Sequence, residues 1–240
     1  MPVYRIRPLP INRINLPKEF MTHYHGFGER VNIVNYSWYI EGSKENIIID
    51  TGSTAKLLNW RFAKAEDIQT PEEALKPLGL KPKDIDIVIF THMHFDHIHL
   101  AKKFENAKFV VQKKELEFAK NPNPIQAVDY FRKVLDLNYE VVNGDIEIVT
   151  DVKLLLTPGH TPGCQSVVIR TEKGVAVITG FCCIDENFNP PEEIKKYLHM
   201  LIPGIYMNDM EMYNSMLRVK EVADIVIPLH EKKYSEIEYI

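Results

Sequence analysis

Cysteine is scarce in this sequence, and long apolar runs are absent. Only three of the 240 residues are cysteines, and two of them, Cys182 and Cys183, are adjacent. Neighbouring cysteines rarely reach the geometry of a disulfide, so free thiols or metal ligands are expected rather than a disulfide framework. No window approaches the roughly 18 apolar residues of a membrane span, and residues 1–20 lack the apolar core of a signal peptide. We therefore expect a cytoplasmic protein with no membrane partner.

An excess of charge of one sign is also missing. The 29 basic and 33 acidic residues are spread along the chain and give a net charge of −4. Because proteins that bind polyanions concentrate Lys and Arg in a patch or stripe, no nucleic-acid partner is predicted. The length and a hydrophobic content of 45% allow a substantial core, and we expect a single domain over residues 1–240.

Apolar periodicity predicts strands and helices in two successive groups. Strands are predicted at 31–40, 46–50, 84–90, 107–112, 138–143, 145–157, 165–171, 174–180 and 224–228, and helices after "DTGST" and at 70–79, 113–120, 124–137 and 208–223. That order favours two packed sheets with helices outside, an α+β fold of the four-layer αββα kind, over a single doubly wound sheet.

Four histidines and an aspartate fall within ten residues directly after a buried apolar run. The stretch is "FTHMHFDHIH", residues 90–99. Alternate residues of an extended chain point to the same side, so His92 and His94 can meet one ion. Asp96 and His97 follow at once and can serve a second ion beside the first. Imidazole nitrogen and carboxylate oxygen suit zinc, iron, manganese or cobalt.

Two distant stretches each place one further histidine at the end of an apolar run. In "LLLTPGHTPGCQS" a strand breaks into a Pro-Gly turn that presents His160, and in "IVIPLHE" a strand breaks at Pro228 just before His230. An isolated histidine is more often a surface or packing residue than a ligand. The repeated placement at strand ends favours the interpretation that both join the first cluster.

The stretches "THMHFDH", "TPGHTPG" and "PLHE" resemble the metal-binding motifs of the metallo-β-lactamase superfamily. Their order and separations are closest to those of its quorum-quenching N-acyl homoserine lactone lactonases, and the similarity runs from "IIIDTG" to the C-terminus. The resemblance implies a metallo-β-lactamase-like αββα sandwich with its active site at the edge where the sheets open. It implies one ion held by His92, His94 and His160, a second held by Asp96, His97 and His230, and Asp50 orienting a metal-bound histidine.

The sequence departs from the family pattern after the strand predicted at 174–180. Family members usually carry an aspartate there that bridges the two ions, and Phe181 stands in its place. A phenyl ring cannot bind a metal. Cys182 can replace the aspartate as a thiolate ligand, or it can be a buried packing residue. Asp185 is a weaker substitute.

Three further features concern the surroundings of the site. Ile98 and His99 replace glycines that often follow the first motif, and we expect them to reshape its floor, with His99 not a ligand. The tyrosine that follows the bridging aspartate in the lactonases is absent, because Cys183 or Ile184 stands there. The stretch "THYHGFGER", at 22–30, is expected to be a mobile loop at the mouth of the site, and its two histidines, His23 and His25, are not expected to bind metal.

These residues predict a metal-dependent hydrolase that opens a small lactone of the acyl homoserine lactone type. Two divalent metal ions, with zinc the first choice, would supply a metal-bound hydroxide at neutral pH. Asp96 would hold that nucleophile and pass its proton to the leaving group. The alternatives are hydrolysis of another ester, a thioester or a phosphodiester, a degenerate single-metal binding module, or redox chemistry on an iron pair. The partner is a small-molecule substrate, and a homodimer is one option for the oligomeric state.

Overall fold

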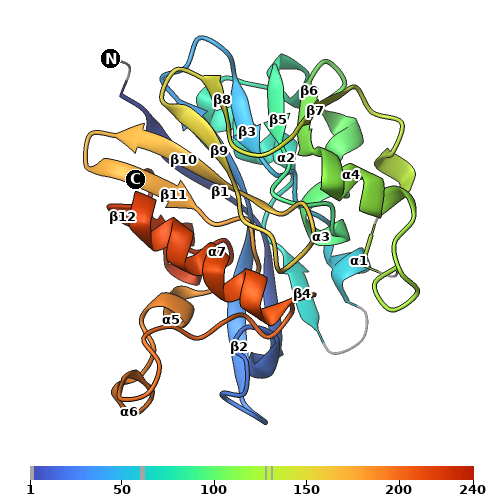
Figure 1. The fold of residues 1–240 in the computed structure, drawn as a ribbon. Coiled ribbons are helices and arrows are strands. Elements are labelled where there is room, and N and C mark those ends of the chain that lie inside the picture. The colour runs from blue at the N-terminus through green and yellow to red at the C-terminus, as the bar shows by residue number, and fades with distance from the viewer. Residues whose placement is uncertain (1–2, 60–62, 128, 131) are drawn as a thin grey trace.

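The structure, a computed structural model, describes residues 3–59, 63–127, 129–130 and 132–240, which form two β-sheets with helices around them (Figure 1). The first sheet has the strand order β4-β1-β2-β3-β5-β6-β7 and the second has the order β12-β11-β10-β9-β8. The first sheet contains β1 (Arg5–Pro17), β2 (Arg30–Glu41), β3 (Ile47–Ile49), β4 (Lys64–Asp67), β5 (Ile87–Ile89), β6 (Lys108–Gln112) and β7 (Tyr139–Val142). The second contains β8 (Ile146–Val149), β9 (Val152–Leu156), β10 (Gln165–Thr171), β11 (Gly174–Ile178) and β12 (Ile225–Ile227).

The helices are short except for the last one. They are α1 (Ala55–Leu58), α2 (Pro71–Leu75), α3 (Phe95–Ile98), α4 (Lys113–Lys120), α5 (Asp185–Phe188), α6 (Glu192–Lys195) and α7 (Asp209–Val222). None of the helices in the described part of the chain combines the length and the apolar character of a membrane span.

The largest apolar cluster lies between the two sheets. Along β2 the alternate residues Tyr36, Trp38 and Ile40 are buried, as the two-residue period of a strand requires. They share one cluster with Val167 and Ile169, which alternate in the same way on β10. The two sheets therefore pack face to face over a common core.

Helices cover the outer face of each sheet. Leu75 of α2 and Leu116 of α4 pack in one cluster with Phe109 of β6. On the other side, Met212 of α7 packs in a separate cluster with Val177 of β11, and Figure 1 shows α7 lying across the second sheet. The four layers confirm the predicted αββα arrangement.

The helix predicted at 124–137 was wrong, and the strand predicted at 145–157 is two strands, β8 and β9. The structure has no α-helix within the described residues of 124–137; it has turns and a 3-10 helix, Arg132–Val134, while residues 128 and 131 lie outside the described part. Asp129 and Tyr130 instead pair with the histidine loop, since Phe95 N–H donates to Asp129 O and His94 forms a β-bridge with Tyr130. This tertiary pairing overrides the local helical tendency.

The long strand β1 carried no prediction. Pro8 and Pro10 made its sequence unlike a strand, because proline cannot donate a ladder hydrogen bond. Both lie where β1 pairs only with β2, and β4 joins its other side later, at Asn12–Asn15. The prolines thus occupy a stretch of β1 that has a neighbouring strand on one side only.

The helix predicted at 70–79 begins where expected and ends early. Thr70 and Glu73 form a capping box at the start of α2. Pro77 has no N–H to continue the helix, and the chain tightens into a 3-10 turn, Lys76–Leu78, that ends at Gly79 with a φ of 72°.

Five strands end at the same edge of the sandwich. The parallel pair β3 and β5 runs out at Ile49 and Ile89, and the parallel pair β11 and β12 runs out at Ile178 and Ile227. Strand β9 ends just before the Pro-Gly turn of residues 158–159. The loops that follow these five ends carry the predicted site residues.

Candidate metal centre

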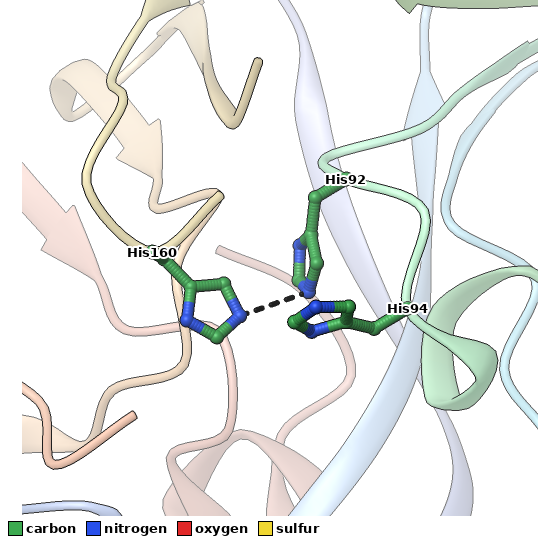
Figure 2. Close-up of side chains that lie close together, drawn as sticks. All are labelled: His92, His94 and His160. Carbon is green, nitrogen blue, oxygen red and sulfur yellow. Dashed lines mark hydrogen bonds between the residues drawn. The ribbon is translucent and has the colours of Figure 1, made fainter. Parts of the chain in front are cut away.

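The predicted histidines converge from three distant segments. Donor atoms of His92, His94 and His160 lie within 4.8 Å of one another, and so do donor atoms of His92, Asp96 and His97. Figure 2 shows the first group, with His92 and His94 on one loop facing His160 on another. His230 completes the cluster, because its Nε2 lies 4.0 Å from Asp96 Oδ2. All five histidines are buried.

Hydrogen bonds fix the ring orientation of the two histidines that face each other. His160 Nδ1 lies 2.7 Å from the carbonyl oxygen of Ile205, so it must donate. His92 Nδ1 lies 3.1 Å from Thr91 Oγ1, whose own proton goes to Asp50 Oδ2. In the neutral rings the proton therefore sits on Nδ1 in both cases. Their Nε2 atoms face each other at 3.1 Å with two lone pairs and no proton between them.

Hydrogen bonds from Nδ1 also orient the rings of His97 and His230, on the other side of the cluster. His97 Nδ1 donates to Asp50 Oδ2 at 2.8 Å, and His230 Nδ1 donates to Val34 O at 3.2 Å. Among the described residues, His94 and His230 each have a buried Nε2 without a hydrogen-bond partner. Buried nitrogens left unpaired cost free energy, and a bound cation is the partner that satisfies several of them at once.

Burial and mutual repulsion keep most of these rings neutral. Burial lowers the pKa of His160 to about 4 and that of His230 to about 3. It also lowers the pKa of His92 and His94, and the neighbouring rings act in the same direction. Neutral imidazole is the form that binds a metal, so the electrostatics prepare this cluster for a cation.

One ring behaves differently because two carboxylates flank it. Burial lowers the pKa of His97, but Asp96 and Asp50 outweigh it and raise the pKa to about 10. Burial likewise raises the pKa of Asp96, yet the charge of His97 dominates and holds it below its usual range. His97 Nε2 lies 3.1 Å from Asp96 Oδ2. The position between these two atoms therefore favours positive charge.

The Asp50 carboxylate holds the loop of residues 90–99 at two places, Thr91 and His97. It directly follows β3, is fully buried and has a φ of 57°, a left-handed conformation that Asp tolerates better than most residues. Its carboxylate accepts hydrogen bonds from Thr91 N–H and Thr91 Oγ1 as well as from His97. The residue is thus placed to orient a histidine, as the resemblance implied.

The turn after β11 places consecutive side chains on opposite sides. Phe181 packs in the cluster under α7, with Phe188 and Met212. Cys182 packs in a different cluster and lines the same cavity as Asp96. Burial raises the pKa of its thiol, and the nearby charge of Asp96 adds to the effect.

The described residues of this turn bring no carboxylate into the cavity. Cys182 Sγ contacts Met21 Sδ at 3.6 Å, and the thiol is not part of either group of close donor atoms. Asp185, the weaker substitute, instead forms an ion pair with Lys233 at 2.8 Å.

The remaining histidines of the sequence analysis have other partners. His23 Nδ1 lies 3.2 Å from Tyr206 OH, and His25 Nε2 pairs with Glu186 at 3.0 Å. His99 Nδ1 lies 3.2 Å from Ser53 Oγ. Ile98 is buried in the apolar cluster on the outer face of the first sheet. The backbone carbonyl of His97 accepts hydrogen bonds from Thr51 N–H and Gly52 N–H.

A largely apolar cavity of about 240 Å³ opens onto the cluster. Its lining includes five residues of the candidate site, His94, Asp96, His160, Cys182 and His230, and ten others, Ile14, Leu16, Phe20, Met21, Ile33, Leu58, Ala63, Phe95, Asp129 and Ile205. A ligand that binds here meets the donor atoms of the cluster and, at most other lining positions, hydrocarbon.

Several supporting residues were not predicted. The carbonyl groups of Val34 and Ile205 orient two histidines, and no side-chain pattern reveals a main-chain acceptor. Tyr130, whose ring lies edge-on to His94 at 5.0 Å, sits in the stretch predicted as helix. Glu115, whose carboxylate accepts from Met93 N–H beside His94, lies within the helix predicted at 113–120. These residues reach the candidate site only because the fold brings distant segments together.

Comparison with known proteins agrees with this geometry. Residues 32–180 match the model of a family described as the metallo-beta-lactamase superfamily. An N-acyl homoserine lactonase of Bacillus cereus is 29% identical over 93% of this chain and 90% of its own length. The N-acyl homoserine lactonase AiiA of Bacillus thuringiensis subsp. kurstaki is 30% identical over the same shares of the two chains.

Solved structures show the same fold. A mutant of B. thuringiensis AiiA with N-decanoyl-L-homoserine bound at its active site superposes with a TM-score of 0.81, at 26% identity and full coverage of both chains. An N-acyl homoserine lactone hydrolase with the product N-hexanoyl-L-homoserine bound at its catalytic metal centre also gives 0.81, at 27% identity and full coverage.

Proposed function

The chain belongs to the metallo-beta-lactamase superfamily, and we propose that it is a metal-dependent hydrolase that opens small lactones of the N-acyl homoserine lactone type. The observation that carries the proposal is the set of inward-facing, proton-free ring nitrogens, above all the two Nε2 atoms of His92 and His160 at 3.1 Å. With the ring protons on Nδ1, neither Nε2 atom can donate to the other, whereas a cation between them can bind both.

We assign two ions to the cluster. His92, His94 and His160 would hold the first, and Asp96, His97 and His230 the second, with Cys182 as a further ligand of the second in place of a bridging carboxylate. The nitrogen-rich donor set with one carboxylate favours zinc, and iron, manganese and cobalt have the same ligand preferences. When bound, such ions lower the pKa of a shared water and polarise a substrate carbonyl.

Asp96 is proposed to carry the proton through the reaction. Its carboxylate faces His97 and His230, and these rings hold its pKa low, so it is ionised at neutral pH and able to accept a proton. Ring opening needs that proton on the departing alkoxide. Asp96 Oδ would take it from the attacking water and return it to the leaving oxygen.

The cavity supports a substrate with an apolar acyl group. Met21, Leu58 and Ile205 line it beside the cluster, so an alkyl chain can lie against hydrocarbon while the lactone meets the donor atoms. The solved relatives hold N-decanoyl- and N-hexanoyl-L-homoserine, which have this shape. A phosphodiester would bring negative charge against largely apolar walls.

A substrate panel at equal concentration tests the reaction class. We expect turnover of N-hexanoyl-homoserine lactone to exceed that of a nitrophenyl ester, a thioester and a phosphodiester, and a phosphodiester as the preferred substrate would contradict the proposal. His94→Ala should abolish turnover and reduce bound metal. His199→Ala is the matched control, because His199 is exposed and lies outside the cluster.

A single-metal binding module is the second candidate. It is favoured by one observation, the placement of Phe181 in the core under α7, away from the cavity. Metal analysis of the protein as purified separates the two: about two equivalents per chain support the hydrolase with its ion pair, and one or fewer supports the binding module.

A further inference from the structure

Glu115 is a fully buried carboxylate that the mechanism above does not use. It lies in the first turn of α4, on the outer side of the first sheet, with an exposed fraction of 0%. Burial raises the pKa of its carboxyl, while four hydrogen bonds oppose that effect. Burying a carboxylate costs free energy, and these hydrogen bonds offset that cost.

The two carboxylate oxygens bond to two different metal-binding loops. Oε1 accepts from the backbone N–H of Met93 at 2.8 Å, between His92 and His94. Oε2 accepts from Thr161 Oγ1 at 2.7 Å and from the backbone N–H of Gly163 at 3.1 Å, next to His160. One side chain therefore spans the two loops that supply the first ion's ligands.

Tyr130 adds a third connection to the same group. Its hydroxyl donates to Glu115 Oε1 at 3.3 Å, and its ring packs edge-on against His94. The carboxylate thereby also holds the ring that supports one of the histidines.

The second loop lies directly against the start of α4. A Cβ added at Gly163 would come within 2.2 Å of Glu115 N, a contact that no side chain can make. The start of α4 therefore fixes the place of the His160 loop, and the Glu115 side chain links the His92 loop to it.

Only a carboxylate matches the donors that surround this position. Two of the four are backbone N–H groups, one at each oxygen, and a backbone N–H cannot act as an acceptor. A glutamine would place its amide N–H₂ against one of the two, so one loop would lose its hydrogen bond and face a donor.

We propose that Glu115 is a positioning residue that sets the distance between the His92–His94 loop and the His160 loop, and thereby the affinity and coordination geometry of the first metal ion. The inference rests on the proposed function, since it assumes that these histidines bind metal. It assigns no role to Glu115 in contact with the substrate.

Glu115→Gln tests the proposal by metal binding rather than by turnover. In a His230→Ala background, which removes a ligand of the second ion only, cobalt(II) affinity is measured by competition with a chelator, and the visible absorption of bound cobalt reports its coordination geometry. We expect Glu115→Gln to weaken binding about 10- to 100-fold, the usual effect of losing an outer-shell partner, and to shift the visible band. Tyr4→Phe is the control, since Tyr4 is buried and donates to Thr150 O at 2.7 Å, and it lies outside the donor groups and the cavity lining.

Three results are distinguishable. Weaker binding and a shifted band in Glu115→Gln, with Tyr4→Phe unchanged, support the positioning role. Unchanged affinity and spectrum in Glu115→Gln overturn it and leave the proposed function intact. If the parent protein binds no cobalt at all, the proposed function fails and this inference fails with it.

A second variant covers the case in which Glu115→Gln does not fold. Thr161→Val removes one hydroxyl that donates to Glu115 and keeps the shape of the side chain. It should weaken cobalt binding by a smaller factor and shift the band in the same direction. An unchanged affinity and spectrum in this variant would also overturn the proposal.

Discussion

The two halves of the metal centre each combine two residues of the 90–99 motif with one histidine from a distant loop, and they differ in their further neighbours. On the first side, His92 and His94 face His160, and hydrogen bonds to Glu115 and to Ile205 O hold the two loops. On the second side, Asp96 and His97 face His230, and the turn after β11 brings Cys182 into the same cavity. The first side is held by hydrogen bonds to buried groups, whereas the second side borders a turn whose sequence departs from the family pattern.

The largest expected effect separates the two halves directly. His92 belongs to both groups of close donor atoms, whereas His230 lies beside Asp96 on the second side alone. His92→Ala should therefore lose both ions and all measurable turnover, and His230→Ala should retain close to one ion. Elemental analysis of the two purified variants checks this. Equal metal content in both would show that the cluster does not divide into these halves.

The next effect concerns Asp50. In Asp50→Asn, the amide oxygen accepts the hydrogen bond from Thr91 N–H, so the amide N–H₂ group faces His97 Nδ1. His97 Nδ1 must then accept a hydrogen bond instead of donating one. The His97 proton moves to Nε2, the atom that would bind the second ion. Affinity for that ion should fall about 10- to 100-fold. Asn tolerates the same left-handed backbone, so the fold is not the cause.

Stepwise chelator titration measures this change, with Asp185→Asn as the control, because Asp185 pairs with Lys233 outside the cavity. A loss confined to the first ion, or a loss of equal size in Asp185→Asn, would contradict the assigned role of Asp50.

The smallest expected effect is at Cys182. If its thiolate is a ligand of the second ion, Cys182→Ala lowers the occupancy of that ion and leaves the first in place. Cys182→Ser should fall between the two, since a hydroxyl is a poorer ligand for zinc than a thiolate. Metal content measured after dialysis against a weak chelator checks the order. Identical content in all three proteins would make Cys182 a packing residue against Met21.

The local sequence pattern predicted those features of the site that depend on residues close together in the sequence. The alternation of His92 and His94, and the strand end before them, follow from the two-residue period of extended chain. The position of His160 and His230 after apolar runs was also visible in the sequence. The structure brings both near the 90–99 loop, at the edge of the sandwich where the preceding strands end.

The parts that escaped prediction depend on contacts between distant segments. Glu115 bonds to Met93, 22 residues away, and to Gly163, 48 residues away, and nothing in its own helix signals either contact. Tyr130 forms a β-bridge with His94, although the sequence predicted a helix there. In both cases tertiary contacts decided the outcome, and local propensity could not reveal them.

Side chains from three separate segments meet at one place, and we propose that they bind cations there. Anomalous diffraction at the zinc edge, from crystals of the zinc-loaded protein, locates such ions without any assumption about turnover. We expect one peak among His92, His94 and His160 and a second beside Asp96, His97 and His230. Zinc peaks elsewhere on the molecule, with none among these histidines, would contradict it.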